Sequence, residues 1–127
     1  MLRTFLRSKI HSATVTEANV EYMGSLSIDE DLLDLAGLQE YEQVHIANVT
    51  NGERLTTYAI KAPRGSRTIG ANGAAAHLVR EGDKVIIFCY GQYDEKDLEE
   101  YSPRLVFVND QNDPIPGPRK EQHAQIL

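Results

Sequence analysis

The chain has 127 residues, which is the size of one domain with its own hydrophobic core. Its net charge is −6 and it contains no basic cluster, so a nucleic-acid partner bound through its phosphates is disfavoured. The sequence has no apolar run long enough for a membrane span or a secretory signal, and its single cysteine, Cys89, cannot form an intrachain disulfide, so we expect a cytoplasmic protein.

Residues 9–16 alternate weakly between polar and apolar side chains, which predicts a β-strand. We expect Lys9, His11, Ala13 and Val15 to share one face of this strand. From the residues alone, Lys9 is better explained as a solvated strand end, and His11 as a surface residue, than as binding residues.

The dipeptide Gly24-Ser25 is a candidate site of self-cleavage. Gly24 has no Cβ to shield its carbonyl carbon, so the Ser25 hydroxyl could attack it and exchange the amide for an ester. Elimination and hydrolysis would then leave a pyruvoyl group at position 25, and backbone strain would be part of the mechanism. Gly-Ser pairs also occur in plain turns, so the dipeptide alone does not establish cleavage.

Residues 27–36 carry a helix signature. Ser27 and Glu30 have the spacing of a capping box, in which each side chain accepts a hydrogen bond from a free backbone N–H group. Gly37 then predicts the end of the helix. We expect this helix to anchor the chain just after Ser25.

Two β-prone runs, residues 44–50 and 54–60, flank an Asn-Gly pair and predict a β-hairpin. On the second strand Arg54 and Tyr58 share one face, about 13 Å apart, while Thr57 points to the other. A regular strand therefore cannot bring all three to one small ligand. Either this strand is bulged or a site forms between two subunits.

Residues 72–79 predict a turn entering a helix, where the small side chains after Gly73 let a ligand reach backbone N–H groups or let the helix pack tightly. Residues 83–89 predict a buried strand that places Cys89 in the core. A short charged helix or turn is expected at 94–101 and a last strand at 104–108. The polar, proline-containing tail 109–127 is expected to be disordered or to lie over a neighbouring subunit.

Several short motifs occur in order along the chain: Lys9-Ile10-His11, Ala13-Thr14-Val15-Thr16, Ala18-Asn19, Tyr22-x-Gly24-Ser25, Asn51-Gly52-x-Arg54-x-x-Thr57-Tyr58 and Asn72-Gly73-Ala74-Ala75-Ala76. Together they resemble the pyruvoyl-dependent aspartate 1-decarboxylase family. The resemblance covers roughly residues 1–108. It implies a mainly β fold, a small double-psi β-barrel with a few short helices.

The resemblance also implies how the chain matures and assembles. Cleavage between Gly24 and Ser25 would give a β chain of residues 1–24 and an α chain of residues 25–127. A maturation factor could assist it. The family's arrangement is a homotetramer with active sites between subunits, which would resolve the difficulty posed by Arg54, Thr57 and Tyr58.

The chemistry implied is removal of the α-carboxylate of L-aspartate, through a Schiff base with a pyruvoyl cofactor made from Ser25, to give β-alanine for pantothenate and coenzyme A synthesis. Tyr58 matches the family's proton donor, and Arg54 and Lys9 match its carboxylate-binding cations. Thr57 matches both a substrate contact and a hydroxyl that stabilises the Gly24 oxyanion during cleavage. The remaining substrate contacts are Asn72, Gly73, Ala74 and Ala75. The sequence has no metal-ligand cluster.

Two positions depart from the family pattern: Ser12 replaces a frequent arginine and Ala47 a frequent aromatic residue. They affect the shape of the pocket rather than the chemistry. The alternatives are a pyruvoyl decarboxylase for glutamate or another amino acid, and an unprocessed β-barrel that binds a peptide without catalysis. A small DNA-binding barrel is disfavoured by the acidic composition.

Overall fold

The structure is a computed structural model that describes residues 1–126. The strands are β1 (Arg3–Thr14), β2 (Glu17–Asn19), β3 (Ser25–Asp29), β4 (Gln43–Asn48), β5 (Arg54–Ala62), β6 (Ile69–Asn72), β7 (Lys84–Tyr93), β8 (Arg104–Val108) and β9 (Pro114–Ile115). The helices are α1 (Glu30–Ala36), the short 3₁₀ helix η1 (Gly73–His77) and α2 (Glu95–Leu98). Within the described residues, none of these helices has the length and apolarity of a membrane span.

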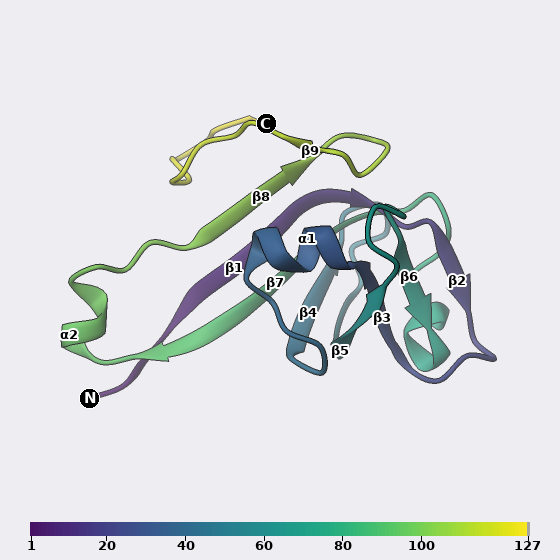
Figure 1. Cartoon of the computed structure of the whole chain (residues 1–127), viewed down its shortest axis with the longest axis horizontal. Coiled ribbons are helices and arrows are strands. Elements are labelled where there is room, and N and C mark those ends of the chain that lie inside the picture. The colour runs from purple at the N-terminus through teal and green to yellow at the C-terminus, as the bar shows by residue number, and fades with distance from the viewer. Residues whose placement is uncertain (127) are drawn as a thin grey trace.

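The strands follow one another in the order β2-β6-β3-β5-β4-β7-β1-β8-β9. β3 runs parallel to β5 and antiparallel to β6, while β1 lies antiparallel to β7 and parallel to β8. Beyond the part of β1 that pairs with β8, β1 and β7 continue as a two-stranded ribbon that ends at α2 (Figure 1). The predicted mainly β fold is confirmed, and the nine-stranded order is consistent with a small barrel.

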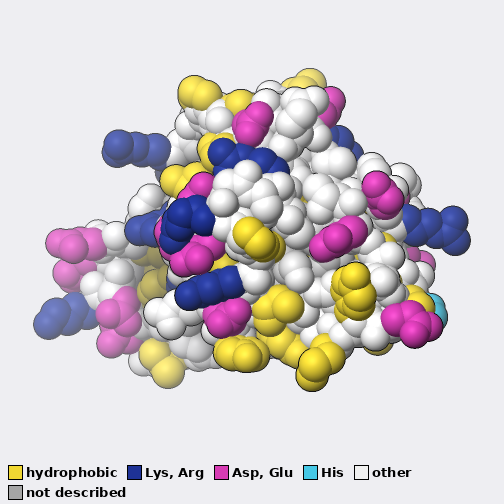
Figure 2. Space-filling model, turned by 45° about the vertical axis from the view of Figure 1, so that its right-hand side comes forward, with side chains coloured by type: hydrophobic (Ala, Val, Ile, Leu, Met, Phe, Trp, Pro, Cys, Tyr) yellow, Lys and Arg dark blue, Asp and Glu magenta, His cyan; other side chains and the backbone are white. Residues whose placement is uncertain are grey.

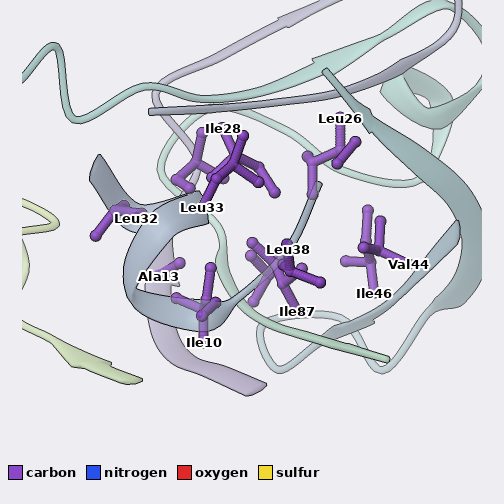
Figure 3. Packing of buried hydrophobic residues seen from close by; sticks show 14 of the residues in the cluster. Ile10, Ala13, Leu26, Ile28, Leu32, Leu33, Leu38, Val44, Ile46 and Ile87 are labelled. Carbon is purple, nitrogen blue, oxygen red and sulfur yellow. The ribbon is translucent and has the colours of Figure 1, made fainter. Parts of the chain in front are cut away.

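The core is built from aliphatic side chains, as the composition predicts, and Figure 3 shows them converging from the sheet and from α1. The fully buried members include Ile10 of β1, Leu26 and Ile28 of β3, Leu32 of α1, Val44 and Ile46 of β4 and Ile87 of β7. Cys89 is buried at the edge of this cluster, which confirms its prediction as a core residue. The removal of these apolar side chains from water is the main stabilisation of the strands around the site.

A bulge in β1 contradicts the predicted common face of Lys9, His11, Ala13 and Val15. The register between β1 and β7 shifts between Ile10 and Ala13, and Ser12 has a left-handed φ of +63°. An extra residue reverses which side the following side chains point to. Ala13 and Val15 therefore lie in the core, while Lys9 and His11 stay half-buried on the opposite side.

The helix predicted over 27–36 begins later than expected. Ser27 lies in β3, and the N-cap of α1 is Asp29, whose Oδ1 accepts a hydrogen bond from Asp31 N at 2.8 Å. The Ser27 capping box was wrong because pairing of β3 with two neighbouring strands keeps this residue extended. The helix ends at Gly37, as predicted.

The hairpin of β4 and β5 is confirmed, and its register is continuous from Gln43↔Tyr58 to Ala47↔Arg54. The strand that carries Arg54 and Tyr58 is therefore regular rather than bulged over this stretch. Residues 109–115 differ from the expected disorder, because β9 pairs with β8; contact of the tail with a neighbouring subunit stays a prediction. Asn112 is also buried, with its amide donating to the carbonyl oxygens of Thr14 and Arg67.

Candidate active site

Ser25 is the first residue of β3 and is buried, with 1% of its surface exposed. It pairs with Asn72 of β6, whose side-chain Nδ2 donates to Ser25 Oγ at 3.1 Å and to Ser27 Oγ at 2.8 Å. Because the amide is the donor in this bond, the hydroxyl proton of Ser25 is not used in it. The arrangement holds the serine oxygen in place and leaves its proton available for transfer.

The backbone at Ser25 is strained. Its φ is +151°, in a region that residues with a side chain rarely adopt. Such conformations cost free energy and persist only where the surroundings enforce them. At Ser25 the enforcing contacts are the pairings of β3 with β5 and β6. The strain lies at the peptide bond that the sequence singles out.

A cavity of about 230 Å³ opens beside Ser25. Its lining residues come from β3, β5, β6 and η1: Gly24, Ser25, Leu55, Thr56, Thr57, Tyr58, Asn72, Ala74, Ala75 and Leu78. The parallel register Leu26↔Ala59 explains this grouping, because it sets the residue before each, Ser25 and Tyr58, side by side. Most of the predicted site residues are thus gathered around one small cavity.

Tyr58 lies at the mouth of this cavity with 37% of its surface exposed. Its ring stacks on Tyr41, with centroids 6.1 Å apart and an angle of 29° between the planes. This stacking limits the positions that the Tyr58 ring can take. Tyr41 was not predicted as a site residue, because it stands in the turn between α1 and β4, where the sequence shows no periodic pattern.

Arg54 lies in a neighbouring hollow of about 380 Å³ rather than in the Ser25 cavity. Its guanidinium carbon sits 5.8 Å from the centre of the Phe88 ring. His45 and Tyr90 complete the aromatic wall, and Thr56 lines both hollows, so the two are adjacent along β5. Thr56 was not predicted as a site residue, although the alternation of β5 places it between Arg54 and Tyr58.

Lys9 is also outside the Ser25 cavity. A cross-strand row runs from Thr56 through His45 and Phe88 to Lys9, three strand spacings or about 14 Å in all. The Lys9 ammonium is paired with the Glu121 carboxylate of the tail at 2.6 Å. A single chain therefore does not bring Lys9 to the Ser25 cavity.

His11 lines a third hollow, of about 300 Å³, between β1, β8 and the tail. Within residues 1–126 its buried Nδ1 has no hydrogen-bond partner, and its ring contacts Phe107 edge-on at 5.7 Å. Burial lowers the pKa of His11, and the Lys9 ammonium lowers it further. His11 is therefore held as a neutral imidazole at neutral pH.

The two departures from the expected motif also have defined places. Ser12 forms the bulge of β1 and lines the His11 hollow. Ala47 is the cross-strand partner of Arg54, so its small side chain leaves the space beside the guanidinium open. Among residues 1–126 no cluster of His, Cys, Asp or Glu side chains is arranged to hold a metal ion.

Comparison with known proteins gives one consistent result. The family model described as aspartate decarboxylase matches residues 1–115. The chain is similar to the aspartate 1-decarboxylase of Caldicellulosiruptor saccharolyticus, with 50% identity over 100% of this chain and 99% of that protein. It is 51% identical to that of Phenylobacterium zucineum over 89% of this chain and 96% of the other, and 48% identical to that of Desulfitobacterium hafniense over 98% of each.

Proposed function

The chain belongs to the aspartate decarboxylase family, and from this membership we propose that it removes the α-carboxylate of L-aspartate to give β-alanine and carbon dioxide. The observation that carries the proposal is the strained, buried Ser25 beside a cavity that also contains Thr57, Tyr58 and Asn72. A cytoplasmic location remains our expectation from the sequence.

The first proposed step is cleavage of the chain by itself. The Ser25 oxygen attacks the Gly24 carbonyl carbon, the carbon–nitrogen bond breaks, and the nitrogen takes a proton, so that an ester replaces the amide. Loss of the α-proton of residue 25 then expels Gly24 as a carboxylate, and water displaces the nitrogen as ammonia to leave a ketone. The strain at Ser25 and the hydrogen bond that its oxygen accepts from Asn72 support a cleavage that begins with attack by this oxygen.

Thr57 is the proposed stabiliser of the cleavage step. It lines the same cavity as Gly24 and Ser25, on the strand next to theirs. A hydroxyl donor aimed at the carbonyl oxygen lowers the energy of the oxyanion that forms when the serine attacks. A maturation factor could assist this step from outside the chain.

A keto group at position 25 fits the residues present. The position is buried, small residues line one side of the cavity, and the Asn72 amide is within hydrogen-bond distance of the side-chain oxygen. Such a group would supply an electron-withdrawing carbonyl to a bound amine. We therefore propose a pyruvoyl cofactor derived from Ser25.

The chain's own residues would bind the substrate and move the proton. Tyr58, in register with Ser25, is the proposed proton donor to the carbon that loses its carboxylate. Leu55, Leu78 and Ala75 give the cavity apolar walls, which favour a neutral carbon dioxide over a carboxylate anion. The backbone of Gly73 and Ala74 would contact the substrate from η1.

The two cations support a site completed by a second copy of the chain. Arg54 has a planar fork suited to a carboxylate, but it lies one hollow away from Ser25, and Lys9 lies three strand spacings from Thr56. Large hydrophobic side chains such as Tyr22, Met23 and Tyr90 are exposed, and hydrophobic side chains gather along the lower part of the face in Figure 2. We propose a homotetramer with active sites between subunits.

Two measurements on the purified protein test the proposal. Denaturing mass spectrometry should find two fragments that meet at Gly24 and Ser25, the larger without an N-terminal amine. The same sample should release carbon dioxide from L-aspartate faster than from L-glutamate. A chain that stays in one piece on prolonged warming and releases no carbon dioxide would contradict the proposal, and faster turnover of glutamate would change the substrate.

A further inference from the structure

Gly73 lies against the backbone of the segment before the cleavage site. It is buried at the junction of β6 and η1, with a left-handed φ of +63°. A Cβ at this position would lie 2.7 Å from Gly24 Cα, 2.9 Å from Gly24 N and 3.1 Å from Tyr22 O. The backbone of residues 22–24 thus passes directly over the place where a side chain would be.

Gly24 itself shows the opposite situation. A Cβ built on Gly24 would meet no atom within 4 Å. Packing therefore does not require a glycine at position 24, whereas it does require one at position 73. The steric constraint on the cleavage site belongs to the residue that faces it from η1.

We propose that Gly73 is a positioning residue for self-cleavage, because its missing side chain lets the Gly24 backbone approach the β6–η1 junction and present its carbonyl to the Ser25 hydroxyl. The inference rests on the proposed self-cleavage. Asn72 holds the serine oxygen at 3.1 Å, and the next residue supports the chain that carries the carbonyl. Asn72 and Gly73 thus position the two groups that react, the Ser25 hydroxyl and the Gly24 carbonyl.

The size of the effect follows from the contact distances. Cβ atoms in proteins essentially never lie closer than 3.0 Å to another heavy atom, so a side chain at 73 must displace Gly24 by several tenths of an ångström. Reacting atoms need to be about 3–3.5 Å apart, and a misplacement of about 1 Å costs roughly a hundredfold in rate. We therefore expect Gly73→Ala to slow cleavage by about ten- to a hundredfold.

The experiment compares the rate of cleavage, followed by denaturing mass spectrometry, in wild type and three variants. Gly73→Ala adds a Cβ and left-handed strain. Gly73→Asn adds a Cβ with less strain, because asparagine tolerates this φ better. Gly52→Ala is the matched control, since Gly52 has a φ of +80° but open space around its Cβ position. Both Gly73 variants should cleave slowly, and Gly52→Ala should cleave at the wild-type rate.

A chemical readout separates positioning from a general loss of structure. Hydroxylamine cuts an ester at Gly24 but not the amide, so the fraction cut reports how often the Ser25 oxygen has attacked. This fraction should fall in both Gly73 variants while their circular dichroism and thermal midpoints remain those of a folded chain.

Three results would overturn the inference. Wild-type cleavage rates in both Gly73 variants would show that the contact does not matter, and unfolding of both would make Gly73 a residue of stability alone. Equal slowing in Gly52→Ala would assign the effect to left-handed strain. A wild-type chain that never cleaves would instead refute the proposed self-cleavage, and this inference with it.

Discussion

Asp29 offers the sharpest test of how β3 is held in place after Ser25. Its side chain is fully buried, and its two oxygens accept from Asp31 N, Gly65 N and Arg67 N at 2.8, 3.0 and 2.7 Å. Arg67 Nη1 adds a fourth bond, at 3.1 Å. One carboxylate thus joins the start of α1 to the loop between β5 and β6.

Asp29→Ala should lower the free energy of unfolding by about 3–4 kcal/mol. Each backbone N–H group left without a partner costs about 1 kcal/mol at the low end of the usual range, because water reaches part-buried donors. Loss of the bond from the part-exposed Arg67 side chain adds a smaller contribution, because solvent screens the guanidinium. Asp29→Asn should lose less, because its amide oxygen still accepts.

Urea unfolding at neutral pH measures this difference, in a Ser25→Ala background that keeps the chain in one piece. Asp34→Ala is the control, since that carboxylate is 62% exposed and, among residues 1–126, pairs only with Arg64, so it should change stability by less than about 1 kcal/mol. A loss below about 1 kcal/mol in Asp29→Ala would refute the reasoning.

The pH dependence follows from the same contacts. Burial raises the pKa of Asp29, but hydrogen bonds from the backbone of Arg67, Asp31 and Gly65 and from the Arg67 side chain outweigh it, so the pKa lies below its usual value of 3.8. The folded state therefore holds the proton less tightly than the unfolded state. This stabilisation is present above pH 3.8 and is lost as the pH falls through the folded pKa. The gap between wild type and Asp29→Asn should narrow over that range.

Three further predictions concern the reaction. Ser25→Ala should abolish both cleavage and carbon dioxide release, and an alanine variant active at the wild-type rate would exclude a pyruvoyl cofactor from Ser25. Tyr58→Phe keeps the stacking on Tyr41 and should cleave normally, but should lose about a hundredfold or more in kcat; an unchanged kcat would remove Tyr58 as the proton donor. Glu121→Gln weakens the pair that occupies Lys9 and should lower the KM for aspartate a few-fold with kcat unchanged, whereas an unaltered KM would show that Lys9 does not bind substrate.

The parts of the fold that depend on local sequence were predictable. The strand predicted at 104–108 coincides with β8, and the hairpin of β4 and β5 formed around its Asn-Gly turn. The bulge at Ser12 and the shift of the helix cap from Ser27 to Asp29 were not predictable, because each results from pairing with strands distant in sequence. Periodicity within one segment carries no information on such pairings.

Which residues lie around Ser25 was easier to predict than how they are arranged. The motifs named Ser25, Thr57, Tyr58 and Asn72, which the structure gathers around one cavity. The spacing of Arg54 and Tyr58 predicted their separation on a regular strand, but only the continuous register of β5 shows that the strand is regular and that Arg54 lies in a separate hollow. The contact between Gly73 and Gly24 was equally hidden, since only the fold brings the two glycines together.

The position of β1 between β7 and β8 has a consequence for refolding of the protein. β1 is hydrogen-bonded on both sides, to β7 and to β8, yet it belongs to the piece that cleavage would separate from them. A cut after Gly24 would leave two chains held together without a covalent link. Once denatured, they could regain the fold only by meeting again in solution, so recovery would depend on protein concentration. The uncut precursor is thus the form suited to folding, and the cut form retains a structure that it could not readily build again.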